Sequence, residues 1–150
     1  MKKTIVVFAS GNGSNFASLL KAVRLGKLRC TVGLLVCDNP SAGVLDKARK
    51  AGIETLLVDR AVFADRAAFE AAILQGLKKY PIDLIVLAGF MRILSPRMVA
   101  AFRGRIINIH PALIPMFCGQ DMYGKRVHQA VVAAGVRITG CTVHYADNNY

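Results

Sequence analysis

An asparagine and a histidine stand two positions apart at the end of one apolar segment, which reads Ile107-Asn108-Ile109-His110-Pro111-Ala112-Leu113-Ile114-Pro115. Residues i and i+2 of a strand point to the same face, so the Asn108 amide and the His110 imidazole can reach one cleft. An amide that donates to a developing oxyanion, beside a ring that carries a proton near neutral pH, suits acyl transfer. A single Asn-x-His pair is a weak pattern, and a turn-capping Asn with a structural His explains it equally well.

A glycine-rich turn follows the first apolar segment, residues 4–9, whose lack of alternation is typical of a parallel strand buried on both faces. The turn reads Ser10-Gly11-Asn12-Gly13-Ser14-Asn15, and a helical pattern with Phe16, Leu19, Leu20 and Val23 comes next. Strand, turn and helix in this order present backbone N–H groups at a helix N-terminus, where phosphate binds. We favour this interpretation over a tight turn that is capped only by Ser or Asn.

The same turn partly matches the dinucleotide-binding fingerprint. Gly11 and Gly13 occupy its first two glycine positions, and Asp38 closes the next expected strand, residues 31–37. The third glycine position holds Phe16, whose ring would push the helix away from the strand. The loop therefore suits one phosphate better than a pyrophosphate, and Asp38, in an Asp-Asn-Pro turn, is at least as well explained as a helix cap.

Length and composition predict one globular domain in a reducing compartment. The chain has 150 residues, of which 54% are hydrophobic and 19% charged, enough for a full core. No apolar run reaches the roughly 18 residues that a membrane span needs, and no signal peptide is recognisable. The four cysteines are scattered, and no His/Cys/Asp cluster has metal-ligand spacing. We expect a cytoplasmic protein with reduced thiols and no metal.

The net charge of +11 raises the question of nucleic acid, because 20 Lys and Arg oppose nine acids. The basic residues are dispersed over the expected helices, Trp is absent, and aromatic residues make up 7% of the chain. We interpret them as a solvated basic surface that favours small anionic ligands. We expect no specific nucleic-acid partner and no membrane partner.

Strand and helix patterns alternate along the whole chain. Strands are expected at 4–9, 31–37, 54–58, 83–88, 105–109 and 137–145, the last with a bulge at Gly140. Helices are expected after the glycine-rich turn and at 42–51, 65–80, 98–102 and 123–134, with Asp65 and Ser95 as N-caps. This order predicts an α/β fold with a doubly wound, mostly parallel sheet. Ligands bind such sheets at the carboxyl ends of the strands, which here lead into residues 11–15, 89–94 and 108–115.

Three segments of the chain together resemble the phosphoribosylglycinamide formyltransferases, a folate-dependent family of purine synthesis. They are the turn at 10–15, the Asn-His segment at 108–115, and Leu87-Ala88-Gly89-Phe90-Met91-Arg92-Ile93-Leu94-Ser95-Pro96. Asn-x-His-Pro-x-Leu-x-Pro is shared with other folate formyltransferases and with formyltetrahydrofolate hydrolases, whereas the Gly-Asn-Gly-Ser-Asn turn is narrower. The resemblance implies one Rossmann-like formyltransferase domain over residues 1–150, which transfers a formyl group from 10-formyltetrahydrofolate to the amine of glycinamide ribonucleotide.

The resemblance also implies a role for each matched residue. The substrate phosphate would be held by Gly13, Ser14 and Asn15. The folate would be held by Arg66, Met91, Arg92, Ile93, Leu94 and Asn108, although an exposed helix Arg or an ordinary strand-to-helix connection would look the same. Asn108 would bind the formyl oxygen and His110 would shuttle a proton, both at a strand end outside the core. We expect His128 to lie on the surface, His144 to be structural, and Cys118 not to be a nucleophile.

The family completes its catalytic trio with an Asp after the strand that contains His144. Aligned from His144, that Asp falls one place beyond Tyr150, and Asp147 matches an earlier acidic position. We therefore expect the chain to end before the family's C-terminal segment. The alternatives are a 10-formyltetrahydrofolate hydrolase and a catalytically incomplete fragment that binds a nucleotide phosphate. An uncovered strand edge would promote association, for example as a homodimer.

Overall fold

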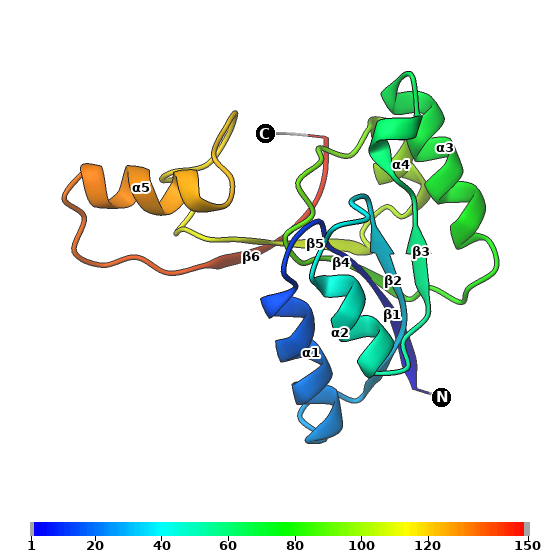
Figure 1. Cartoon of the computed structure of the whole chain (residues 1–150). Helices are drawn as coiled ribbons and strands as arrows, with labels where there is room; N and C mark the ends of the chain where they lie inside the picture. The colour runs from blue at the N-terminus through cyan, green and yellow to red at the C-terminus, as the bar shows by residue number, and fades with distance from the viewer. Residues whose placement is uncertain (1, 149–150) are drawn as a thin grey trace.

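The computed structural model describes residues 2–148, which contain one six-stranded sheet in the order β3-β2-β1-β4-β5-β6 (Figure 1). All neighbouring strands are parallel except β5 and β6, which are antiparallel. The strands are β1 (Lys3–Phe8), β2 (Cys30–Cys37), β3 (Thr55–Leu57), β4 (Leu84–Leu87), β5 (Ile106–His110) and β6 (Thr142–Tyr145). The predicted α/β class and mostly parallel, doubly wound sheet are confirmed.

Helices cover both faces of the sheet because the central strands are apolar on both sides. Val6 and Phe8 of β1 join one core cluster, while Ile5 and Val7 join another. The first cluster includes side chains of α3 (Arg66–Leu77) and α4 (Pro96–Ala101), and the second includes those of α1 (Ser14–Arg24) and α2 (Val44–Lys50). Phe16, the residue that breaks the dinucleotide fingerprint, is fully buried in the second cluster.

Local capping signals begin two helices as predicted. The Asp65 side chain accepts from Ala68 N at 2.7 Å at the start of α3, and the Ser95 hydroxyl accepts from Met98 N before α4, with Pro96 as the first helical residue. A short 3-10 helix, η1 (Arg60–Val62), lies between β3 and α3 and is capped by Asp59. No sequence pattern had indicated it.

The last predicted strand is too long. Residues 137–141 lie outside β6, and Gly140 is therefore not a bulge within it. The register between β1 and β2 is irregular instead, because Ile5 pairs with Val32 and Val6 with Leu34, which leaves Gly33 of β2 as the extra residue. A Cβ on Gly33 would stand 2.7 Å from Thr4 Cγ2. A glycine in a strand therefore marks the irregularity, but at a different strand from the one expected.

The fifth α-helix, α5 (Lys125–Ala133), is set apart from the other helices, beside β6 (Figure 1). It buries Val127 and Val131 with Ala112 in a small separate cluster. Among the described residues, no helix has the length and apolar character needed to cross a membrane.

Candidate active site

The loops that follow β1, β4 and β5 meet at one edge of the sheet. Phe8 pairs with Leu87, and Leu87 pairs with Asn108, so the three strands reach this edge side by side. The strand order reverses between β1 and β4, which is where open α/β sheets bind their ligands. The fold thus brings together the three segments that the sequence predicted at the carboxyl edge.

Asn108 is partly buried and faces β6, not His110. Its Nδ2 lies 3.1 Å from Nε2 of His144, the residue paired with it across the two strands. The other ring nitrogen of His144, Nδ1, lies 3.1 Å from the Tyr145 carbonyl, which can only accept. In the neutral ring the proton therefore sits on Nδ1, and Nε2 accepts one of the two Asn108 N–H groups. The contact with His144 uses one N–H of Asn108 and leaves the second as a further donor.

His110 is buried, with 8% of its surface exposed. It ends β5 and is not a member of the hydrophobic core clusters formed by the described residues, as predicted, although its side chain is buried. Its Nε2 donates to the Phe117 carbonyl at 2.8 Å, and this leaves Nδ1 as the nitrogen that can accept a proton. Asn108 and His110 share a face of β5 by their spacing, and each is oriented by a partner from a different segment.

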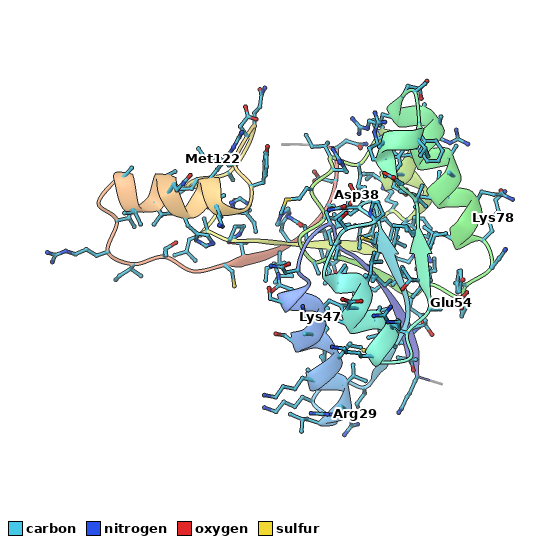
Figure 2. All side chains as sticks on the ribbon, in the orientation of Figure 1. Arg29, Asp38, Lys47, Glu54, Lys78 and Met122 are labelled. Carbon is cyan, nitrogen blue, oxygen red and sulfur yellow. The ribbon has the colours of Figure 1, made fainter. Side chains whose placement is uncertain are left out.

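The glycine-rich turn ends in a helix start that no side chain caps. Gly13 is the N-cap of α1 in a left-handed conformation, with φ 72°, and no side-chain hydrogen bond is made there. The interpretation of Ser or Asn as the cap is therefore wrong, and the first N–H groups of α1 keep their capacity for an anion. Two residues of α2 contact the turn: Val44 N donates to Gly11 O at 3.1 Å, and the Lys47 ammonium donates to Asn12 O. Lys47 is labelled in Figure 2.

Residues 89–94 leave β4 and pass over the ends of β1 and β2. Ser10 N donates to Gly89 O at 3.1 Å, and Met91 N donates to the Ser10 hydroxyl at 2.9 Å. Arg92 Nε donates to Asp38 Oδ2 at 2.7 Å. Asp38 accordingly does not cap α2, which was one of the two interpretations of this residue, and its buried carboxylate lies at the carboxyl end of β2 (Figure 2).

Arg66 reaches the same segment through a second buried acid. Its Nε lies 3.3 Å from Oε1 of Glu70, one turn along α3. The same Glu70 oxygen accepts from Ser95 N at 2.8 Å, and the Ser95 hydroxyl donates to its other oxygen. Arg66 keeps a half-exposed side chain, so its guanidinium still borders solvent beside this segment.

Among the described residues, hollows open at both ends of the sheet. One, of about 480 Å³, borders the carboxyl edge between Ser10, Asp38, Arg60 and Arg92. A larger, mostly apolar hollow of about 580 Å³ lies at the other end, where Lys3, Cys30 and Asp83 line it. The first lies at the edge where parallel sheets bind their ligands, and Met91 and Arg92 line it, but Asn108, His110 and the start of α1 are not among its lining residues.

Sequence reasoning did not assign a role at this edge to three residues. Asp38 was interpreted either as the acid of a dinucleotide fingerprint or as a helix cap, His144 as structural, and Glu70 was not singled out. Thr142 and His144 alternate on β6 as His110 and Asn108 do on β5, and this alternation could have indicated that they pair. Glu70 lies four positions after Arg66, a spacing that could have indicated their ion pair.

The other candidate residues lie elsewhere. His128 is exposed on α5, as predicted. Cys118 donates to the Pro115 carbonyl, and Cys30, Cys37, Cys118 and Cys141 are all free thiols. Within residues 2–148, no group of three or more His, Cys, Asp or Glu side chains could hold a metal ion.

Comparison with known proteins identifies the family to which this chain is similar. The model of the formyl transferase family matches residues 3–150. The phosphoribosylglycinamide formyltransferase of Bacillus subtilis (strain 168) is 40% identical over 145 residues, which are 97% of this chain and 72% of that protein. The chloroplastic enzyme of the same name from Vigna unguiculata is 36% identical over 99% of this chain. The match covers 48% of the Vigna protein, so this chain spans about half of that protein's length.

Solved structures agree with the sequence comparisons. Glycinamide ribonucleotide transformylase 1 from Geobacillus kaustophilus superposes with a TM-score of 0.91 at 41% identity, over 99% of this chain and 77% of that one. The six-stranded sheet and its flanking helices therefore have the fold of that enzyme.

Proposed function

Because this chain belongs to the formyl transferase family, we propose that it transfers a formyl group from 10-formyltetrahydrofolate to the amine of glycinamide ribonucleotide. Members of the family use a formylated tetrahydrofolate as co-substrate. The observation that carries the proposal is the position of Asn108 and His110. Both lie at the carboxyl end of β5, at the same edge of the sheet as an uncapped helix start, in a chain 40% identical to an enzyme named for this reaction.

The phosphate of the ribonucleotide fits the start of α1. The amides of Gly13, Ser14 and Asn15 lie at the positive end of an 11-residue helix whose first turn holds no acidic residue. Lys47 adds a positive charge next to the same turn. An anion bound here would satisfy the N–H groups that no side chain caps.

The folate fits the segment 91–94. Met91 and Ile93 expose apolar side chains, 47% and 56%, which can lie against a flat ring, while the backbone of the segment supplies polar groups along its edge. Arg92 within this segment and Arg66 beside it each have a half-exposed guanidinium, suited to the carboxylates of a folate tail.

The chemistry follows from the two side chains of β5. The substrate amine attacks the formyl carbon, and the free N–H of Asn108 donates to the oxygen as it becomes negative. His110 Nδ1 takes a proton from the attacking nitrogen, while the Nε2 contact to Phe117 keeps the ring in one orientation. Tetrahydrofolate then leaves with the proton that His110 returns to it.

The test is release of tetrahydrofolate from 10-formyltetrahydrofolate with and without glycinamide ribonucleotide. It would be run on residues 1–150 and on a chimera that adds the part of the Bacillus subtilis enzyme that the chain does not cover. Release that requires the amine supports the proposal. Release of formate and tetrahydrofolate without the amine would instead identify a hydrolase, and binding of the ribonucleotide without release from either polypeptide would identify a phosphate-binding protein.

A further inference from the structure

Two buried acids from other elements hold the two ends of the segment that we assign to the folate. We infer that Asp38 and Glu70 are positioning residues, which fix residues 91–94 in the conformation that receives the folate before it arrives. The inference rests on the proposed function, since it assigns a purpose to contacts at the proposed folate edge. Neither acid was predicted to belong to the site.

Asp38 holds the first end. Its side chain is 1% exposed, and Oδ2 accepts from Arg92 Nε at 2.7 Å, across 54 positions of the chain. Ser10 adds two contacts beside it, from its own N–H to Gly89 O and from Met91 N to its hydroxyl. Residues 89–92 are thereby tied to the ends of both β1 and β2.

Glu70 holds the second end. Its side chain is 6% exposed, and its two oxygens accept from the backbone N–H and the hydroxyl of Ser95. Its third partner is Arg66, itself a proposed folate residue. One buried carboxylate therefore sets the position of both the Arg66 guanidinium and the end of the segment.

Stability alone does not explain two buried carboxylates. Asp38 Oδ1 is buried and has no hydrogen-bond partner among the described residues, so this charge is incompletely paired. Well-packed apolar residues in place of a buried ion pair are often neutral or stabilising. Between the two contacts, Met91 and Ile93 nevertheless expose their apolar side chains. A segment whose backbone is held in place and whose exposed side is apolar is prepared for a ligand. Because it is already ordered, it loses less conformational entropy when the ligand binds.

The experiment compares Asp38→Asn and Glu70→Gln, which keep side-chain shape and remove the charge, with Asp46→Asn as the control. Asp46 is an exposed acid that pairs with Arg49 on α2, far along the chain from the segment. Amide hydrogen exchange of residues 91–94 is measured without ligand. Calorimetry then gives the affinity for 5-formyltetrahydrofolate, a stable reduced folate, and for glycinamide ribonucleotide.

In both test variants, we expect exchange at 91–94 to rise and folate affinity to fall by about tenfold, as expected when a pre-organised segment must be ordered on binding. Affinity for the ribonucleotide should stay within about twofold, since its proposed site lies at α1. Asp46→Asn should change neither. A purely structural role would loosen exchange across the whole chain and weaken both ligands together.

Ser10→Ala is a milder variant, which keeps the inference testable if the acid variants do not fold. It removes only one hydroxyl, which accepts from Met91 N. It too should raise exchange at 91–94. Unchanged exchange in this variant and in the acid variants would overturn the inference, as would folate affinity equal to wild type. If neither the wild-type chain nor its chimera bound 5-formyltetrahydrofolate, the proposed function would fail, and with it the folate role of the two acids. The exchange data would still show whether the acids hold the segment.

Discussion

Asn108 and His144 form a direct cross-strand pair, with Nδ2 of the amide 3.1 Å from Nε2 of the ring. The Tyr145 carbonyl places the neutral ring's proton on Nδ1, so the ring can only accept from the amide. This contact fixes the orientation of the Asn108 side chain, whose carboxamide nitrogen is the donor. The geometry therefore separates a residue proposed to act on the substrate from one that orients it.

Asn108→Ala should reduce formyl transfer by about a hundredfold or more, with little change in substrate binding, as for loss of an oxyanion donor. His144→Ala should reduce it by a smaller factor, about tenfold, because the amide remains and only its orientation is lost. Steady-state kinetics of an active polypeptide, the chain or its chimera, would measure both. If His144→Ala were the more damaging of the two, the assignment of their roles would be reversed.

His110→Ala and His110→Gln separate chemistry from stability. The Ala variant leaves the Phe117 carbonyl without its donor and should lower the free energy of unfolding by about 1–3 kcal/mol. Gln can still donate to Phe117 and should recover part of that loss. Both should lower turnover by about a hundredfold or more, because neither side chain can shuttle a proton. Urea unfolding and kinetics on the same samples give the comparison, and near-normal turnover in the Gln variant would remove His110 from the mechanism.

Gly13→Ala should weaken binding of glycinamide ribonucleotide by about tenfold or more and leave the affinity for 5-formyltetrahydrofolate nearly intact. A Cβ at this left-handed position would stand 2.7 Å from Val44 Cβ, so the turn must move. Gly26→Ala is the matched control, since Gly26 has nearly the same φ, 71°, and a Cβ there meets nothing within 4 Å. Calorimetry on both variants decides the matter, and equal losses for the two ligands would argue against a phosphate site at α1.

Asp83 should make a pH-dependent contribution to stability. Its hydrogen bond from Lys3, assisted by one from Thr4 N, holds the pKa of the Asp83 carboxyl below its ordinary value. A lowered folded-state pKa stabilises the native chain above the unfolded pKa, and this stabilisation disappears as the pH falls through the folded one. Asp83→Asn should therefore lower the urea midpoint at pH 7, and the gap to wild type should close in strong acid. A gap that stayed constant with pH would show that charge is not its source.

The four thiols should react in an order set by burial. Burial raises the pKa of the Cys37 thiol, so it forms little thiolate, and the side chain is inaccessible. Cys141 is exposed and should be alkylated by iodoacetamide first, with Cys30 and Cys118 between the two. Mass spectrometry over a time course at pH 8 gives the order, and a denatured sample in which all four react is the control. Early labelling of Cys37 would contradict the packing of β2.

Local patterns along the chain were sufficient for much of the fold. The unbroken apolar run of β1 indicated a strand with two covered faces, and Asp65 and Ser95 indicated where α3 and α4 begin. These features depend on neighbours within a few positions, which is the range over which strand alternation and helix capping act. Six apolar segments alternating with helices were likewise enough to predict a mostly parallel sheet.

Only the tertiary structure decided the partners of the site residues. Asp38 meets Arg92 across 54 positions, Asn108 meets His144 across 36, and Glu70 meets Ser95 across 25. Such pairs depend on strand order, on register and on the paths of the loops, and no local spacing encodes those. The burial of His110 likewise depends on how the segment after β5 folds back. The sequence by itself determined which residues stand at the carboxyl edge. The tertiary structure determined which of them touch, because side chains distant in the chain meet only where the packing of strands, helices and loops brings them together.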